Sequence, residues 1–211
     1  MIFKFINQEA IFIHIPKTGG NYIQKIFQIN QMCIDSFVKV SNNQDLINRF
    51  EVRGKFTDNK HQPLSDYCKK DSKFKNFNVF ASVRKPFETL VSLYFSPHRW
   101  VTYDQETGSY INPQNVEFNE DKFLEIVKKE RPAWTMISLS RKQYIPPNKL
   151  VVIRNESLDK DINNIFKGLK HPKIKINHTF YRHNADIVLK NLRLRNLIEN
   201  SEHGKDLKFF Y

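Results

Sequence analysis

The residues of this chain that are best suited to bind an anion form the segment Pro16-Lys17-Thr18-Gly19-Gly20. Paired glycines let the backbone approach a ligand closely and adopt positive φ angles. An apolar run precedes the segment and a helix-periodic run follows it, so the N–H groups at the helix start would point at the same ligand. Thr18 can add a hydroxyl donor and Lys17 a point charge. The segment therefore predicts an anion-binding loop between a strand and a helix.

This loop differs in spelling from the nucleotide-binding loop G-x-x-x-x-G-K-[ST]. In that motif the lysine follows the second glycine and stands beside the hydroxyl that holds Mg²⁺. Here Lys17 precedes the glycine pair, and the strand end at Val83 is followed by Arg84 rather than by a carboxylate. We therefore expect no metal at this site. A kinase that uses the loop with ATP stays open as an alternative.

A second candidate for anion binding lies in "VRKPFETLVSLYF", where Arg84 follows an apolar run and Ser92 lies on the polar side of the next helix. Pro86 opens that helix, where a missing N–H costs little. Arginine binds phosphate through two parallel hydrogen bonds, and serine donates one. Ligands of open α/β sheets bind beyond the carboxyl ends of the strands, so both motifs can face one crevice.

The elements that would position these residues alternate between strands and helices. We expect strands at 9–14 and 79–83, helices at 20–31, 86–95, 118–130 and 185–200, and a strand, turn and helix over 149–166. This alternation predicts a single α/β domain over residues 1–211, with a mainly parallel central sheet between two layers of helices. Residues 96–118 are polar and aromatic, and their length predicts an insertion that serves function.

The composition limits the class of protein. With 211 residues, 40% of them hydrophobic and 18 of them Phe, the chain can bury a core, which excludes global disorder. No apolar run approaches the roughly 18 residues of a membrane-spanning helix, and the first ten residues are too polar for a signal peptide. Cys33 and Cys68 make neither a metal-ligand spacing nor a disulfide framework, as expected in a reducing compartment.

The charge balance points to an anionic partner. The chain has 34 Lys and Arg against 22 Asp and Glu, a net charge of +12. A phosphate-rich nucleotide, an acidic polysaccharide and nucleic acid would all be attracted to such a surface. A basic surface that is merely solvated explains the charge equally well.

Taken together, these stretches resemble a known family. "HIPKTGG" looks like the 5′-phosphosulfate loop of sulfotransferases related to the heparan sulfate 2-O and 6-O enzymes, and "VRKPFETLVSLYF" resembles their 3′-phosphate motif. "KHQPLSDYCKK", "VVIRNESLDKDINNIF" and "KDLKFFY" are similar to further family segments in the same order, so the resemblance covers most of the chain. It implies a P-loop-like fold and 3′-phosphoadenosine 5′-phosphosulfate (PAPS) as the sulfuryl donor.

The resemblance also implies a role for each motif residue. The donor site would comprise Pro16, Lys17, Thr18, Gly19, Gly20, Asn21, Tyr22, Arg84 and Ser92. Lys17 would stabilise the charge that grows on the bridging oxygen of the leaving nucleotide. Arg84 and Ser92 would hold the 3′-phosphate, which distinguishes PAPS from ATP.

A histidine with a near-neutral pKa suits removal of the acceptor proton. His61 is the expected base, because its segment resembles the His-led stretch of the family. His14 is the competing histidine, and we interpret it as structural or as a partner of the base. Asn21 and Tyr22 depart from the family pattern, which often has Thr or Ser followed by a small residue. Thr89 stands where the family often has Arg.

The expected function is transfer of a sulfuryl group from PAPS to an acceptor hydroxyl on a carbohydrate, with an anionic glycan as a candidate acceptor. Acceptor choice would depend on residues 96–118. We expect no nucleic-acid partner, no membrane span and a cytoplasmic location. The alternatives are an ATP-dependent kinase and a non-catalytic basic module for glycan or nucleic acid. Such a module would bind with steep salt dependence, and it does not need two separate anion motifs.

Overall fold

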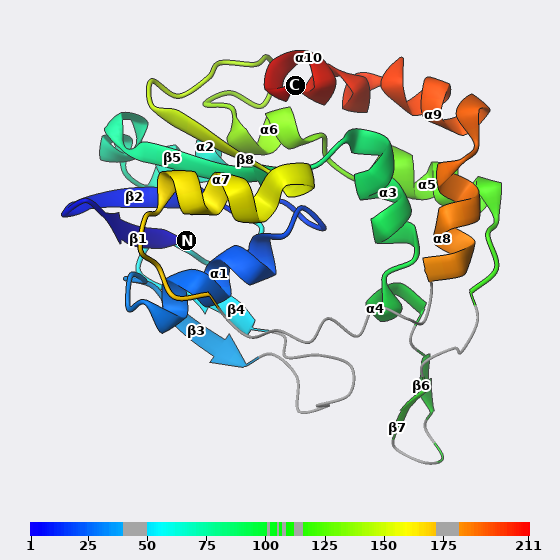
Figure 1. Cartoon of the computed structure of the whole chain (residues 1–211), viewed down its shortest axis with the longest axis horizontal. Helices are drawn as coiled ribbons and strands as arrows, with labels where there is room; N and C mark the ends of the chain where they lie inside the picture. Colours follow the sequence, from blue (N-terminus) through cyan, green and yellow to red (C-terminus); the bar gives the residue numbers. More distant parts are fainter. Residues whose placement is uncertain (40–49, 101, 105, 107–108, 112–115, 172–181) are drawn as a thin grey trace.

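The computed structural model describes residues 1–39, 50–100, 102–104, 106, 109–111, 116–171 and 182–211. A four-stranded sheet lies at the centre of this part of the chain (Figure 1). Its strands, in spatial order, are β1 (Ile2–Phe5), β2 (Gln8–Ile13), β5 (Asn78–Val83) and β8 (Leu150–Arg154). Strands β2, β5 and β8 are parallel, and β1 pairs with β2 in the antiparallel direction. The predicted α/β fold with a mainly parallel sheet is confirmed.

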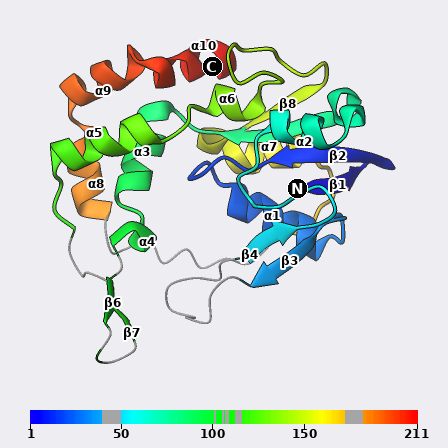
Figure 2. The ribbon, with the colours of Figure 1, turned by 180° about the vertical axis from the view of Figure 1, so that it is seen from behind.

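Helices cover both faces of the sheet and make three layers (Figures 1 and 2). One face carries α2 (Leu64–Lys70), α6 (Ala133–Ile137) and α10 (Lys205–Phe210), and the other carries α1 (Gly20–Ile29) and α7 (Leu158–Ile165). Because both faces are covered, the parallel strands are apolar along most of their length rather than alternately polar.

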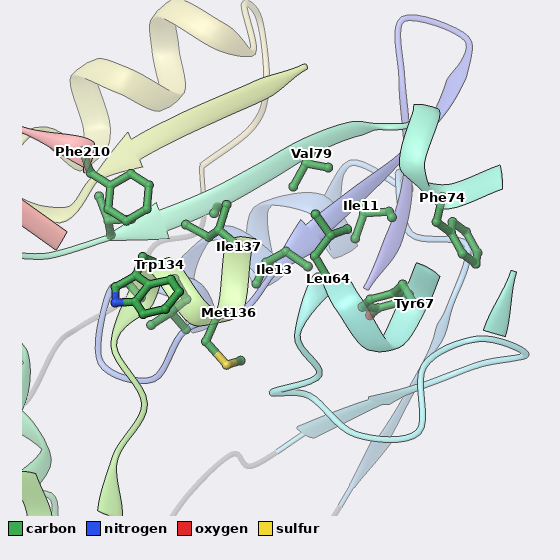
Figure 3. Packing of buried hydrophobic residues seen from close by; sticks show 14 of the residues in the cluster. Ile11, Ile13, Leu64, Tyr67, Phe74, Val79, Trp134, Met136, Ile137 and Phe210 are labelled. Carbon is green, nitrogen blue, oxygen red and sulfur yellow. The ribbon is translucent and has the colours of Figure 1, made fainter. Parts of the chain in front are cut away.

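Successive residues of each strand serve opposite faces of the sheet. Ile11 and Ile13 pack with Leu64 and Trp134 beneath α2 and α6, as Figure 3 shows. Phe12 instead joins the aromatic cluster under α1 and α7. This two-sided burial fixes β2, and with it the start of the loop that follows.

A third group of helices packs beside the sheet around its own apolar cluster. It comprises α3 (Pro86–Tyr94), α5 (Glu120–Lys129), α8 (Arg182–Leu189) and α9 (Leu192–Glu199). The helix expected over 185–200 is divided in two. Asn191 begins the second helix, because its side-chain oxygen accepts a hydrogen bond from Leu194 N at 3.1 Å.

The remaining elements are short. They are the antiparallel pair β3 (Ser36–Lys39) and β4 (Phe50–Arg53), and the 3-10 turns Ser72–Asn76, Asn155–Ser157 and Glu202–Gly204. The expected insertion contains α4 (Pro97–Trp100) and the pair β6 (Thr102–Asp104) and β7 (Ser109–Ile111), which projects from the body in Figure 1. Within the insertion, residues 101, 105, 107–108 and 112–115 lie outside the described residues. None of the helices in the described ranges is long and apolar enough to cross a bilayer.

Candidate active site

The loop between β2 and α1 turns through two residues with left-handed backbone conformations. Lys17 has a φ of 64° and Gly19 a φ of 91°. Gly19 is also the N-cap of α1, and its carbonyl accepts from Tyr22 N at 3.0 Å. No side chain caps this helix start. The first N–H groups of α1 therefore face the mouth of the loop, where an anion would be favoured.

Both glycines are required by their surroundings. A Cβ atom on Gly20 would lie 1.7 Å from Cδ2 of His14, a separation that no packing adjustment of a buried ring can relieve. A Cβ on Gly19 would lie 3.0 Å from Nδ2 of Asn155, in a conformation that side chains rarely adopt. The loop thus packs against its own strand on one side and against the end of β8 on the other.

Thr18 anchors the loop to the neighbouring strand. Its hydroxyl lies 2.9 Å from the Ile15 carbonyl and 2.7 Å from the hydroxyl of Ser82 in β5, and the side chain is almost fully buried. A carbonyl oxygen only accepts, so Thr18 donates its single proton to Ile15 and accepts one from Ser82. The hydroxyl that was predicted to donate to an anion therefore donates its proton within the protein instead. Only the side chain of Thr18 takes part in these two hydrogen bonds, and its backbone N–H group does not.

Lys17 reaches from the loop toward the end of α3. Its Nζ atom lies 3.4 Å from the hydroxyl oxygen of Ser96, the first residue of the expected insertion. The lysine is half-buried, and Pro16 before it is too. This places the ammonium group between the anion loop and the segment predicted to choose the acceptor.

Arg84 follows β5 directly, at the same edge of the sheet as the anion loop. Burial lowers the pKa of its guanidinium, and the nearby negative charges of Glu88 and Glu156 oppose that effect. Arg84 and Thr18 line one small cavity of about 20 Å³ beneath the loop. The parallel sheet therefore brings the two predicted anion motifs together.

The helix after Arg84 carries the other predicted ligand. Ser92 is half-buried in α3. Thr89, where the family often has Arg, turns its hydroxyl back onto the helix and donates to the carbonyls of Arg84 and Lys85 at 3.2 and 3.0 Å. It thus supports the turn that presents Arg84.

Asn21 and Tyr22 occupy the first turn of α1. Asn21 is exposed. The hydroxyl of Tyr22 lies 3.1 Å from Nδ1 of His171, and Nε2 of His171 lies 2.9 Å from the side-chain oxygen of Asn163. Because that amide oxygen accepts the Nε2 proton, Nδ1 is the acceptor for Tyr22. Burial, followed by the charge of Asp159, raises the pKa of Tyr22.

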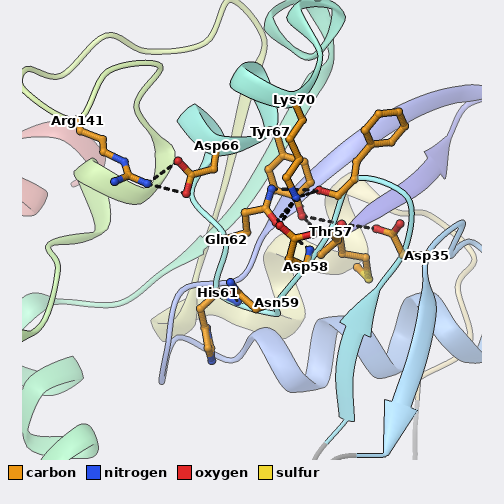
Figure 4. A network of polar contacts seen from close by, with 12 residues as sticks. Asp35, Thr57, Asp58, Asn59, His61, Gln62, Asp66, Tyr67, Lys70 and Arg141 are labelled. Atoms are coloured by element: carbon orange, nitrogen blue, oxygen red, sulfur yellow. Dashed lines mark hydrogen bonds and ion pairs between the residues drawn. The ribbon is translucent and has the colours of Figure 1, made fainter.

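His61 lies at the base of the anion loop, in the segment that leads into α2 (Figure 4). Its Nδ1 atom is 2.9 Å from the backbone carbonyl of His14, and its own N–H donates to the side chain of Asn59 at 2.9 Å. A carbonyl can only accept, so Nδ1 carries the proton and the lone pair of the neutral ring is on Nε2. This tautomer suits a general base.

His14, the competing histidine, is buried beneath His61. The two rings are stacked, with centroids 4.8 Å apart and planes inclined by 24°. Burial lowers the pKa of His14 well below its usual value, and the charges of His61 and Lys60 lower it further. His14 is therefore neutral at physiological pH, and its burial excludes direct exchange of protons with an acceptor in solution.

Several residues of the site escaped sequence reasoning. Glu156, in the 3-10 turn after β8, accepts hydrogen bonds from Lys85 N at 2.9 Å and from the hydroxyl of Tyr211 at 2.8 Å. It thereby holds the turn that presents Arg84. Its position after a strand in "VVIRNES" was the available signal, since neighbouring parallel strands end at one edge.

Asp206 is a buried carboxylate on the wall of the same small cavity. It accepts from the N–H groups of Ala133 and Trp134, both at 2.8 Å, and so caps α6 from α10. Burial raises its pKa to about 7, against the opposing effect of the two hydrogen bonds. No local pattern in the sequence announces this contact, because the partners are more than seventy residues apart.

Comparison with known proteins identifies the chain. The model of the sulfotransferase family matches residues 5–196, a range that contains both anion motifs and His61. The chain belongs to the sulfotransferase family. No curated protein sequence matches it significantly, and no solved structure does so either.

Family membership decides between the functional alternatives. The protein is an enzyme that transfers sulfuryl groups, which sets aside the kinase and the non-catalytic binding module. Among the described residues of this sulfotransferase, no three His, Cys, Asp or Glu side chains gather in a group that could hold a metal ion.

Proposed function

We propose that this sulfotransferase moves a sulfuryl group from PAPS to a hydroxyl on a carbohydrate. The observation that carries the proposal is the meeting of three strand ends at one sheet edge. There Asn155, after β8, leaves no room for a side chain on Gly19. Thr18 bonds to Ser82 in β5, and the His61 ring stacks on His14, which follows β2.

The loop fits the 5′-phosphosulfate of the donor. The ring of His14 occupies the space that a Cβ of Gly20 would fill, so glycine lets α1 begin this close to β2. N–H groups of Gly19, Gly20 and Asn21 would bind the anionic oxygens, as at other helix N-termini. Pro16 and Thr18 would hold the loop in shape, and Tyr22 would flank it.

Arg84 and Ser92 would bind the 3′-phosphate. Arg84 is half-buried, where a charged hydrogen bond is stronger than in water. Its two acidic neighbours, Glu88 and Glu156, would orient the guanidinium. ATP has only a hydroxyl at the 3′ position, so this contact would select PAPS.

The transfer requires two charge movements. Lys17 would stabilise the negative charge on the bridging oxygen of the departing nucleotide; losing one such donor typically costs about 10²–10³-fold in rate. His61 would accept the acceptor proton on Nε2 as the acceptor oxygen bonds to sulfur. The bond from sulfur to the bridging oxygen then breaks and releases 3′-phosphoadenosine 5′-phosphate.

The acceptor class rests on the resemblance of the motifs to the heparan sulfate 2-O and 6-O enzymes. The net charge of +12 supports an anionic glycan. We assign acceptor choice to residues 96–118, because Ser96 at their start contacts Lys17. Residues 1–211 would act as one sulfotransferase domain.

Calorimetric titration with 3′-phosphoadenosine 5′-phosphate, beside ATP with Mg²⁺, tests the donor assignment. We expect micromolar binding of the first nucleotide and at least about tenfold weaker binding of the second. Arg84→Ala should abolish the preference. Arg193→Ala, on α9, removes an equal charge outside the site and should bind like the unaltered protein. Equal binding of both nucleotides by the unaltered protein would refute PAPS as the donor.

A further inference from the structure

His14 holds His61 through two separate contacts. Its backbone carbonyl accepts the Nδ1 proton of His61 at 2.9 Å, and its ring stacks beneath the His61 ring at 4.8 Å. The first contact fixes the tautomer of His61, and the second fixes the plane of its ring. One residue therefore determines which nitrogen of His61 is basic and where that nitrogen points.

One edge of the His14 ring faces the anion loop. The Cδ2 and Nε2 atoms lie 1.7 and 2.2 Å from the position that a Cβ of Gly20 would occupy. The ring thus packs between the first residue of α1 and His61. A shift of the loop would be transmitted to His61 through this ring.

The ring of His14 stays uncharged beside its neighbours. The groups that face it and can carry positive charge are His61 and Lys60, from the segment before α2, and the amino group of Met1, which precedes β1 and whose own pKa burial lowers to about 5. Burial is the main cause that disfavours a charge on the His14 ring, and each of the three groups adds to it when that group is protonated. A neutral aromatic face beneath a histidine stabilises the protonated form of that histidine, as in cation–π pairs.

Packing alone does not account for a histidine at this position. Among the described residues, Nδ1 of His14 is a buried nitrogen without a hydrogen-bond partner. Such a group lowers stability, whereas an apolar side chain next to Phe12 would avoid that cost. A costly buried group beside a proposed base indicates a role in function.

We propose that His14 is a positioning residue for His61, whose tautomer it fixes and whose protonated form its neutral ring supports during transfer. The inference rests on the proposed function, in which His61 receives the acceptor proton. It assigns His14 no contact with donor or acceptor.

Titration of the His61 ring by NMR tests the pair without any substrate. Replacing His14 with Leu removes the aromatic face but keeps the backbone carbonyl, so the pKa of His61 should fall by about half a unit. His14→Phe keeps an aromatic face and should leave that pKa near its original value. His203→Gln replaces another buried histidine and serves as the control. An unchanged His61 titration in His14→Leu overturns the proposal.

Steady-state kinetics give an independent readout. In His14→Leu we expect kcat to fall about tenfold, with the acidic limb of its pH profile moved to lower pH. The same substitution in a His61→Ala background should cause no further loss, because His14 acts through His61. An equal loss in both backgrounds refutes positioning and indicates general damage to the fold.

Two further measurements keep the outcomes distinct. Thermal unfolding identifies variants that do not fold. If His14→Leu does not fold, His14→Gln replaces it with the same expectations, because glutamine is polar and has no aromatic face. Failure of the unaltered protein to use PAPS would refute the proposed function, while the NMR titration would still decide the relation between the two histidines.

Discussion

The hydroxyl oxygens of Thr18 and Ser82 lie 2.7 Å apart in the core, although 64 residues separate them in the chain. Ser82 lies in β5, and Arg84 stands two residues later, in the turn that follows this strand. The hydrogen bond therefore sets the spacing between the loop proposed for the 5′-phosphosulfate and the arginine proposed for the 3′-phosphate. The donor nucleotide would meet two anion sites whose separation is fixed by buried side chains.

Disrupting this hydrogen bond should weaken both stability and donor binding. Thr18→Val and Ser82→Ala each leave a buried polar group or a small void, and each should cost about 1–2 kcal/mol of unfolding free energy. The double variant should lose less than the sum by about 1 kcal/mol. Chemical denaturation measures the coupling, and KM for PAPS should rise in all three proteins. Strict additivity would mean that the two hydroxyls do not cooperate.

Lys17→Ala should reduce kcat by about 10²–10³-fold, because the charge on the leaving oxygen loses its ammonium partner. The fold should persist, since the Lys17 side chain is not part of the core. Initial rates of transfer from PAPS and far-ultraviolet circular dichroism measure the two effects. Lys25→Ala, an exposed lysine on α1, is the matched control and should retain full activity. Retention of activity by Lys17→Ala would remove this residue from the mechanism.

Gly20→Ala should abolish binding of 3′-phosphoadenosine 5′-phosphate. The new methyl group would overlap the ring of His14, and the displaced loop should cost about 1–3 kcal/mol of stability. Gly168→Ala separates strain from overlap, because Gly168 has a φ of 77° but open space around it. That variant should lose about 1 kcal/mol and bind normally. Calorimetry and thermal unfolding provide the comparison, and normal binding by Gly20→Ala would contradict the described loop.

Asp206 should make stability depend on pH between about 4 and 7. Its pKa rises from 3.8 to about 7 on folding, so the unfolded chain releases the proton first. The stability that this group supplies is complete below about pH 4 and is lost as pH rises through about 7, by at most about 4 kcal/mol. Asp206→Asn should remove this decline, which urea denaturation at pH 4, 5.5 and 7 would reveal. If the unfolding free energy of the two proteins changed equally with pH, the raised pKa of the Asp206 carboxyl group would be refuted.

The sequence predicted the parts of the fold that depend on local patterns. The apolar run ending at Ile13 and the run from Val79 to Val83 form strands as predicted. These strands are apolar on both sides because helices cover both faces of the sheet. Pro86 opens α3, and Asn119 caps α5 by accepting from Lys122 N at 2.9 Å. Each of these signals acts within a few residues, so it can be read without knowing the partners.

Contacts between distant segments could not be predicted in this way. The edge strand β1 was not expected, because its few apolar residues acquire a partner only when they fold back on β2. The stacking of His61 on His14 and the capping of α6 by Asp206 depend on tertiary packing. Thr18 is a further example. The loop motif indicated a hydroxyl at this position, but it did not show that the hydroxyl would form a hydrogen bond with Ser82.

The helix α10 also bears on how the enzyme is made. Ribosomes deliver β2 and β5 long before the segment that carries Asp206 and Tyr211. Those two residues secure α6 and, through Glu156, the turn that presents Arg84. A nascent chain would thus contain both anion motifs before the contacts of Asp206 and Tyr211 that secure their surroundings can form. Competence to bind the proposed donor nucleotide would then arise late in translation.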